Sequence, residues 1–331
     1  MSTIRILITG GSGFIGTNAM EFYLKKGYAV LNLDIAEPKI ASHRQHWKKI
    51  DILDGVALTD AVLQFEPTHV LHFAARTDLD ETKNIDGYAA NTRGVENTIA
   101  ALRDCRNLQR IIFTSSMYVC YPGYNPRDYN DFAPHTVYGK SKVISEQIVK
   151  GHASIPCEWL IIRPTSIWGP WFGHPYKDFF YHVMRRSFVK MQGKTATKTY
   201  GFIHNSIAQM DFLLFADRSV VHQKTFYIGD DPGLNINVWA DMIAQQLGIR
   251  MISVPRFVLQ AGALFGDFLG LLGIHFPLQS FRLKNMTTDN VIELLGDMLK
   301  VAPKAPYSVE EGVSMTLKWL QSRDPNFRKA R

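Results

Sequence analysis

The sequence predicts an α/β fold, a doubly wound parallel sheet with a smaller C-terminal α/β substrate lobe. Short apolar segments rich in β-branched residues alternate with longer helical segments up to about residue 163. A glycine-rich turn directly follows the first apolar segment. The alternation ends where proline and glycine cluster, between Pro164 and Pro175. Strands and helices that alternate in this way form right-handed βαβ units around a buried parallel sheet.

The elements follow from this pattern in chain order. We expect strands at 4–9, 29–34, a piece ending at 51, 68–74, 110–115 and 158–163. We expect helices from the glycine turn to residue 26 and at 54–65, 91–103 and 137–150, with a long loop after Pro164. Later helices are expected at 239–247 and 310–320, and an extended piece at 225–228. The predicted domains are 1–165, which binds a dinucleotide and to which later segments can return, and 166–331, mainly a substrate-binding lobe.

Composition limits the class of protein. The 331 residues are 46% hydrophobic and 20% charged, which excludes a disordered chain. The net charge of +7 suits an anionic ligand, an acidic membrane surface or nucleic acid, but it does not choose among them. Three widely spaced cysteines form no metal-binding pattern, and the N-terminus has no signal-peptide pattern. We expect a cytoplasmic protein with reduced thiols, no metal ion and no nucleic-acid partner.

The first motif is the turn TGGSGFIG at 9–16. Glycines allow a tight turn, let backbone N–H groups approach a pyrophosphate, and let the helix pack closely on the strand. Asp34 ends the second predicted strand, where a carboxylate can accept both ribose hydroxyls of NAD and repels the 2′-phosphate of NADP. No arginine follows Asp34 immediately, so the sequence predicts NAD as the cofactor.

The second motif is YGKSK at 138–142, together with Ser116 at the end of the fifth strand. Tyr138 and Lys142 are four residues apart and share one face of a helix. A nearby ammonium and a cationic nicotinamide would favour the phenolate of Tyr138, which makes it a candidate base. Ser116 would hold the substrate oxygen, and Lys142 would also bind the nicotinamide ribose.

These motifs, with HFAA (72–75), FTSS (113–116) and RPTSIWGP (163–170), resemble the extended short-chain dehydrogenase/reductase family. The chain is most similar to its NAD-dependent nucleotide-sugar epimerases and dehydratases, which share a Rossmann-type fold. The resemblance implies a catalytic set of Ser116, Tyr138 and Lys142. It implies cofactor contacts from Gly10, Gly13, Phe14, Ile15, Gly16, Asp34, Asp51, Ile52, Ala74, Ala75, Tyr138, Lys142, Arg163, Pro164 and Thr165. Candidate substrate contacts are Arg76, Ser116, Thr165, His204 and Arg282.

The resemblance also implies an activity. Met117 and Tyr118 stand where the 4,6-dehydratases of the family carry acidic residues, so dehydration is not expected. We expect an epimerase (isomerase) acting at C4 of a diphosphate-linked hexose, as in a nucleotide sugar of polysaccharide biosynthesis, through a 4-keto intermediate. The alternatives are a net ketoreductase or 3β-hydroxysteroid-type dehydrogenase, and a non-catalytic NAD-binding protein. His204 is either a core histidine or a substrate contact. By family analogy we expect a homodimer.

An apolar segment, Phe257–Leu278, is interrupted by Gln260, Asp267 and His275. It is long enough to span a bilayer, but these polar residues favour a helix or helix pair buried in the second lobe, or a surface that touches a membrane or shelters an acyl chain. With the following SFR (280–282), it resembles a smaller group of epimerases for N-acetylglucosamine carried on undecaprenyl diphosphate. The carrier therefore stays open between a nucleotide and a polyprenyl diphosphate, the latter with peripheral membrane contact.

Overall fold

The computed structural model describes residues 4–152, 155–271, 273–274, 280–324 and 327, without the side chains of 281, 282 and 285. The chain forms two compact units. Unit 1 comprises Met1–Ile167, Ile203–Gly229 and Glu293–Pro306. Unit 2 comprises Trp168–Phe202, Asp230–Ile292 and Tyr307–Arg331. The functional boundary at 165/166 stays a prediction, because compactness alone does not show what a unit binds.

A seven-stranded parallel sheet forms the centre of unit 1, with the strand order β11-β6-β5-β4-β1-β2-β3. The strands are β1 (Arg5–Thr9), β2 (Ala29–Asp34), β3 (Trp47–Lys49), β4 (His69–His72), β5 (Arg110–Thr114), β6 (Glu158–Pro164) and β11 (Thr225–Ile228). The chain runs outward from β1 to β3, and then in the opposite direction from β4 to β11. The order reverses between β1 and β4, and doubly wound sheets bind ligands at the carboxyl ends of the strands beside such a point.

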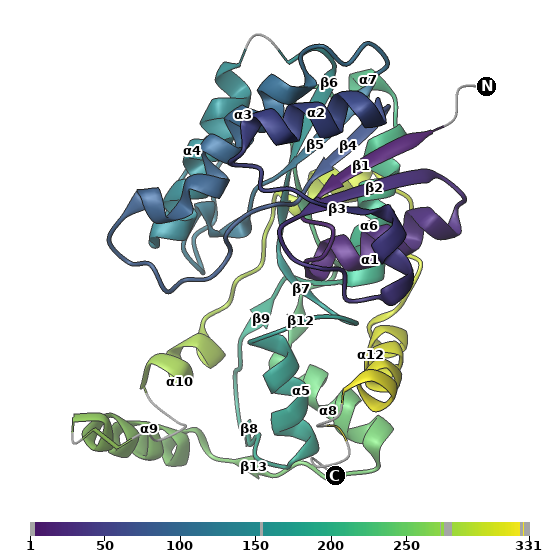
Figure 1. Cartoon of the computed structure of the whole chain (residues 1–331). Helices are drawn as coiled ribbons and strands as arrows, with labels where there is room; N and C mark the ends of the chain where they lie inside the picture. The colour runs from purple at the N-terminus through teal and green to yellow at the C-terminus, as the bar shows by residue number, and fades with distance from the viewer. Residues whose placement is uncertain (1–3, 153–154, 272, 275–279, 325–326, 328–331) are drawn as a thin grey trace. The chain divides into compact units, whose positions relative to one another are not determined.

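Helices cover both faces of this sheet (Figure 1). On one face lie α2 (Gly55–Phe65), α3 (Arg93–Leu102) and α4 (Val137–Gly151), and on the other α1 (Phe14–Lys25) and α6 (Ile203–Phe215). The short helices α7 (Arg218–Val221) and α11 (Leu295–Val301), and the 3-10 helices η1 (Ala41–His46), η2 (Ile85–Asn91) and η3 (Met117–Val119), complete unit 1. Leu7, Val70 and Ile111 of the strands share one buried cluster with Val62 of α2 and Ile99 of α3.

Unit 2 is smaller and contains α5 (Tyr176–Met184), α8 (Ile236–Leu247), α9 (Arg256–Leu271), α10 (Ser280–Thr287) and α12 (Val309–Arg323). Its short strands are β8 (Lys190–Met191), β9 (Thr197–Lys198), β10 (Tyr200–Phe202), β12 (Leu234–Asn235) and β13 (Ser253–Val254). Aromatic rings form its core: the ring centroid of Trp168 lies 5.1 Å from those of Phe202 and Trp239. Gly312 of α12 fits against this core, since an added Cβ would come within 2.9 Å of the Trp168 ring.

The predicted fold class is confirmed, and the predicted strands and helices lie within a few residues of those observed. One expectation was wrong in part: the stretch after Pro164 is not all loop, because it contains β7 (Ser166–Trp168). In the apolar segment, α9 ends at Leu271, and His275 to Leu278 lie outside the described residues. None of the helices that the structure describes combines the length and apolar character needed to cross a membrane.

Candidate active site

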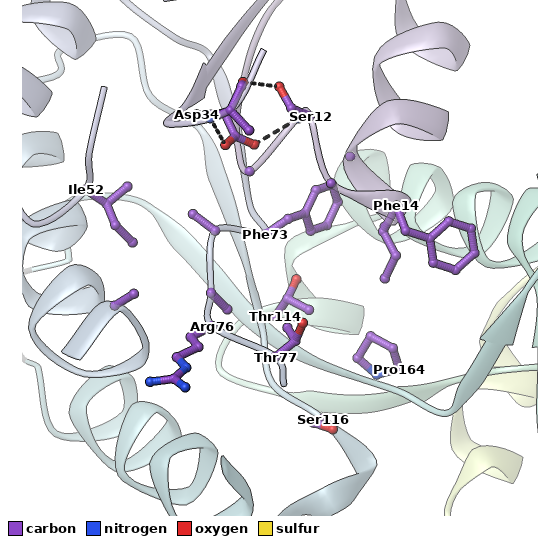
Figure 2. Close-up of a pocket in the computed structure, with 18 of the residues that line it drawn as sticks. Ser12, Phe14, Asp34, Ile52, Phe73, Arg76, Thr77, Thr114, Ser116 and Pro164 are labelled. Carbon is purple, nitrogen blue, oxygen red and sulfur yellow. Dashed lines mark hydrogen bonds between the residues drawn. The ribbon is translucent and has the colours of Figure 1, made fainter. Parts of the chain in front are cut away.

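A cavity of about 730 Å³ opens at the carboxyl ends of the unit 1 strands (Figure 2). All the predicted cofactor residues except Arg163 line it, as do Ser116 and Arg76. Ser12, Phe73, Thr77, Thr114 and Ser115 also line it and were not predicted. The glycine turn, the second-strand carboxylate and the Tyr138–Lys142 pair therefore face one space, although they are far apart in the sequence.

The glycine turn needs its glycines. Gly10 has a φ of +74°, and a Cβ there would lie 2.6 Å from the backbone nitrogen of Ala74. A Cβ on Gly16 would lie 2.2 Å from the carbonyl oxygen of Gly10. Gly13 is the N-cap of α1, and the first turn of this helix carries no acidic side chain. The positive end of the helix dipole is thus directed toward the cavity with no competing side-chain carboxylate on that turn.

The carboxylate of Asp34 is held in place by backbone donors (Figure 2). Ser12 N–H donates to Oδ2 and Ala36 N–H donates to Oδ1, each at 2.9 Å. The buried Asn32 supports this arrangement, because its Oδ1 accepts from Gly11 N–H at 2.9 Å and its Nδ2 donates to Ser12 Oγ at 3.0 Å. Sequence reasoning missed Asn32, although a polar residue inside the apolar strand AVLNLD was a usable signal.

Ser116, Tyr138 and Lys142 all line the cavity, and the Tyr138 and Ser116 side chains share a hydrogen bond. Tyr138 and Lys142 lie on α4, whose first turn is capped by Thr136 Oγ1 accepting from Gly139 N–H at 2.9 Å. Lys142 Nζ donates to the carbonyl oxygen of Thr114 at 2.9 Å. Ser116 follows β5 and caps η3, where its Oγ accepts from Tyr118 N–H at 3.1 Å. Local capping thus fixes both backbones that present these side chains.

Burial dominates the acid–base properties of this cluster. It raises the pKa of Tyr138 to about 12, while a hydrogen bond with the Ser116 side chain acts in the opposite direction. Burial also lowers the pKa of Lys142 to about 8, opposed by the charge of Glu146. The expected preference for a Tyr138 phenolate is therefore not a property of the protein alone. Low polarity penalises the charged form of each group.

Two aromatic residues that the sequence analysis did not predict flank Tyr138. The ring centroids of Tyr88 and Tyr118 each lie 6.0 Å from that of Tyr138. Tyr118 in turn stacks on His135, with 5.7 Å between centroids. These rings contribute to the apolar surroundings of the Tyr138 hydroxyl, and no local sequence pattern indicated their proximity.

The prediction that Arg163 contacts the cofactor was wrong about its side chain. Arg163 is fully buried away from the cavity, in a two-hydrogen-bond ion pair with Glu146 of α4: Nε lies 2.7 Å from Oε1, and Nη2 lies 2.8 Å from Oε2. Consecutive residues of a strand point to opposite faces of the sheet, so Pro164 faces away from the Arg163 side chain, whereas Thr165 follows the last residue of β6 and is not bound by this alternation. Pro164 and Thr165 do line the cavity.

The three predicted substrate contacts outside the motifs have different positions relative to the cavity. Arg76 lines the cavity, where Asp78 accepts from its Nε at 2.8 Å and its guanidinium lies over the Tyr88 ring. His204 is half-buried on α6, which packs against α1, and it does not line this cavity, so the structure favours the packing role. Arg282 belongs to α10, but its side chain lies outside the described part of the chain.

The residues present fit a dinucleotide. The missing Cβ atoms of the turn leave the backbone accessible. Among the residues that the structure describes, Asp34 Oδ1 and Oδ2 each accept one backbone hydrogen bond, which leaves capacity for hydroxyl donors. In the described structure, Thr114 Oγ1 and Ser115 Oγ are buried in the cavity wall without a hydrogen-bond partner. Buried hydroxyls of this kind normally have a partner, which a bound ligand can supply.

A model of the NAD dependent epimerase/dehydratase family matches residues 6–224, two thirds of the sequence. The chain belongs to this family. Its members depend on NAD, in agreement with the predicted cofactor. The family region contains every catalytic residue predicted from the sequence.

Individual relatives are more distant. The chain is 27% identical to an N-acetyl-alpha-D-glucosaminyl-diphospho-ditrans,octacis-undecaprenol 4-epimerase of Escherichia coli O157:H7, over 95% of both chains. It is 25% identical to a 3-beta-hydroxysteroid dehydrogenase of Mycolicibacterium neoaurum, over 82% of this chain and 77% of the other. The structure of the UDP-glucose 4-epimerase of Thermus thermophilus, solved with NAD, matches with a TM-score of 0.68 at 18% identity. The match covers 97% of this chain and 100% of the Thermus chain. This structural likeness confirms the fold class of this epimerase/dehydratase family member.

Proposed function

We propose that this protein is an NAD-dependent sugar 4-epimerase that acts on a diphosphate-linked hexose through a 4-keto sugar. The observation that carries the proposal is the single cavity lined by the glycine turn, Asp34 and the cluster of Ser116, Tyr138 and Lys142. The 4-epimerase name of a relative that aligns over 95% of both chains supports the position on the sugar.

In this proposal Gly10, Gly13 and Gly16 hold the pyrophosphate, Asp34 holds the adenosine ribose, and Lys142 holds the nicotinamide ribose. Bound NAD supplies a reversible hydride acceptor. Tyr138 takes the proton of the 4-hydroxyl as the sugar is oxidised, and returns a proton to the same oxygen when it is reduced. Ser116 orients that oxygen.

The raised pKa of Tyr138 defines what else the site must supply. With the pKa at about 12, the phenol is protonated at neutral pH in the cofactor-free protein. A bound positive charge near the ring would stabilise the phenolate, and so would the ammonium of Lys142. Tyr138 is therefore expected to become an effective base only when the cavity is loaded, which limits proton transfer to the complete complex.

Met117 and Tyr118 support epimerisation over dehydration, because neither can supply the carboxylic acid that removal of water requires. The carrier remains a choice between a nucleotide and a polyprenyl diphosphate. Two groups of UDP-sugar 4-epimerase structures share this fold, and the relative from Escherichia coli is named for an undecaprenol-linked substrate. Assembly as a homodimer belongs to the same proposal, and sedimentation velocity tests it.

The test is to incubate the purified protein with UDP-N-acetylglucosamine and, separately, with undecaprenyl-diphospho-N-acetylglucosamine, and to read the products by NMR. A 4-epimerase gives the C4 epimer, and NADH does not accumulate in step with the product.

The second candidate is a net dehydrogenase, which the similarity to a 3-beta-hydroxysteroid dehydrogenase favours. It predicts stoichiometric NADH from a hydroxysteroid such as pregnenolone and no epimerised sugar. Formation of NADH with the steroid, together with no conversion of either sugar, would replace the epimerase proposal.

A further inference from the structure

Helix α9 of unit 2 has two apolar faces. One face is buried: Leu259 and Ala263 belong to a cluster with Met191 of β8 and Leu283 of α10, and Gly266 lies on the same side. This packing attaches α9 to unit 2. A surface helix of a globular protein normally exposes polar residues on its opposite face.

The opposite face of α9 exposes large apolar side chains instead. Their exposed fractions are 69% for Phe257, 44% for Val258, 68% for Leu264, 56% for Phe268 and 87% for Leu271. At 3.6 residues per turn, these five positions fall on one side of the helix, away from Leu259, Ala263 and Gly266. We call these five residues the α9 apolar face. Concentrated exposure of this kind marks an interaction surface, since single exposed apolar residues would be scattered.

The charge of the chain is concentrated in the same unit. The segments of unit 2 contain 15 Lys and Arg residues against 9 Asp and Glu residues, whereas those of unit 1 contain 22 against 21. Almost the whole net charge of +7 therefore belongs to the unit that carries α9. Three exposed basic residues lie on or near α9. Arg256 is its first residue, Arg250 precedes it in the chain, and Lys284 lies on α10, which packs against α9.

The dimensions of α9 fit one kind of partner. Its 16 residues make a helix about 24 Å long, with apolar side chains along the whole of one side. An anionic bilayer surface has an acyl-chain boundary, which suits an apolar helix face, and negatively charged headgroups, which suit the basic residues of the same unit. A groove for a folded protein would place polar groups around the rim, but the α9 apolar face extends to its last residue, Leu271.

We infer that the α9 apolar face docks unit 2 on the surface of an anionic bilayer, with α9 lying in the plane of the interface. Phe257, Leu264 and Phe268 enter the acyl-chain boundary, and Arg250, Arg256 and Lys284 contact the headgroups. The inference goes beyond the proposed function and does not depend on it, because it concerns neither the cavity nor the reaction.

The experiment is co-sedimentation of the full chain with vesicles of phosphatidylcholine containing one third phosphatidylglycerol, in the absence of any substrate. The test variant carries Leu264→Glu and Phe268→Glu. The matched control carries Val56→Glu and Leu63→Glu, two exposed apolar residues on α2 of unit 1 that do not line the cavity. Both variants gain the same charge, and thermal melting of each checks that it is folded.

We expect wild type and control to sediment with the vesicles. The test variant should bind with an affinity at least about tenfold lower. Pure phosphatidylcholine vesicles or high salt should weaken wild-type binding several-fold, because part of it is electrostatic. The inference is overturned if wild type does not sediment, or if the folded test variant sediments as well as the control. If wild type does not sediment and sedimentation velocity shows a dimer that only the test variant converts to a monomer, the α9 apolar face contacts a second copy of the chain instead. The vesicle experiment does not measure turnover. A negative result therefore does not bear on the proposed epimerase activity, and the absence of that activity would not bear on vesicle binding.

Discussion

At the scale of single residues, Tyr138 is the clearest test of the proposed chemistry. Tyr138→Phe removes only the hydroxyl from a buried ring between Tyr88 and Tyr118, so packing should persist. We expect turnover to fall about a thousandfold, within the usual contribution of a general acid–base group. NAD affinity, measured by calorimetry, should change little. Turnover near that of wild type would remove Tyr138 from the proposed mechanism.

Asp34 is predicted to choose between the two dinucleotides. Asp34→Ala removes the acceptor of the ribose hydroxyls and the charge that repels a 2′-phosphate. It should therefore lower the affinity for NAD, and the ratio of the NADP dissociation constant to the NAD dissociation constant should fall about tenfold or more. The measurement is the ratio of the two dissociation constants. Asp34→Asn serves as the control, since it keeps an acceptor oxygen and loses only the charge. An unchanged ratio in both variants would mean that Asp34 does not contact the ribose.

Single residues were predictable from the sequence where local geometry demands them. The positive φ of Gly10 and the close approach at Gly16 require glycine, and the spacing of Tyr138 and Lys142 places them on one helical face. The roles of Asn32 and Tyr88 depend on contacts with distant parts of the chain, to which no local pattern refers. The Arg163 side chain was predicted in the cavity because the motif identifies a segment of strand as a whole. The face to which each side chain of that segment points depends on strand alternation.

At the scale of elements, the buried ion pair between Glu146 and Arg163 fixes α4 to β6. Glu146 is four residues beyond Lys142, so the same helix carries the cluster on the cavity and its own anchor in the core. Glu146→Gln leaves the Arg163 charge buried without its counter-charge. It should lower the free energy of unfolding by about 3–5 kcal/mol, as measured by chemical denaturation.

The double variant Glu146→Leu with Arg163→Met provides the control for that prediction. Removal of both charges leaves neither unpaired, so it should be more stable than the single Glu146→Gln variant. If the double variant is the less stable of the two, the pair contributes through the packing and hydrogen bonds of Arg163 with Tyr227 and Tyr129 and not through charge.

The elements themselves were largely predictable because βαβ units repeat a strong local pattern of apolar strand, turn and amphipathic helix. The prediction weakened after Pro164, where strands such as β8, β9 and β12 are two residues long. Such short strands form through tertiary contacts and carry no period of their own. For the same reason, the sequence did not distinguish a buried helix from an exposed one in α9: both of its faces are apolar, and only the structure shows which one is covered.

At the scale of the whole molecule, unit 1 is assembled from three separate segments, and the last two return after parts of unit 2. The sheet gains its edge strand β11 from the second segment, where it pairs with β6 beside Pro164. A boundary at a single position does not describe these compact units, whereas the functional boundary at 165/166 stays a prediction. Sequence patterns alone could only indicate that later segments were able to return, because a four-residue strand such as β11 does not specify its partner.

The buried ammonium of Lys142 should also lower the stability of the whole molecule. Burial lowers the pKa of Lys142 from 10.5 to about 8, so below pH 8 the folded protein holds a buried ammonium that costs about 3 kcal/mol relative to the unfolded chain. Lys142→Met removes this cost and loses the hydrogen bond to the Thr114 carbonyl, worth about 1–2 kcal/mol. At pH 7 and without cofactor, the variant should therefore be more stable by about 1–2 kcal/mol, although it lacks turnover.

The pH dependence separates this effect from simple repacking. Between pH 8 and 10.5 the unfolded chain retains the Lys142 proton more than the folded protein does, so wild-type stability gains on the variant as pH rises. The gain in the free energy of unfolding from Lys142→Met, relative to wild type, should thus be largest below pH 8 and smaller at pH 9.5. Chemical denaturation of both proteins at pH 7 and 9.5 measures it, because other titrating groups are shared and cancel in the difference. A stability difference that stays constant between the two pH values would show that burial does not lower the pKa of Lys142, and that any gain comes from the packing of methionine.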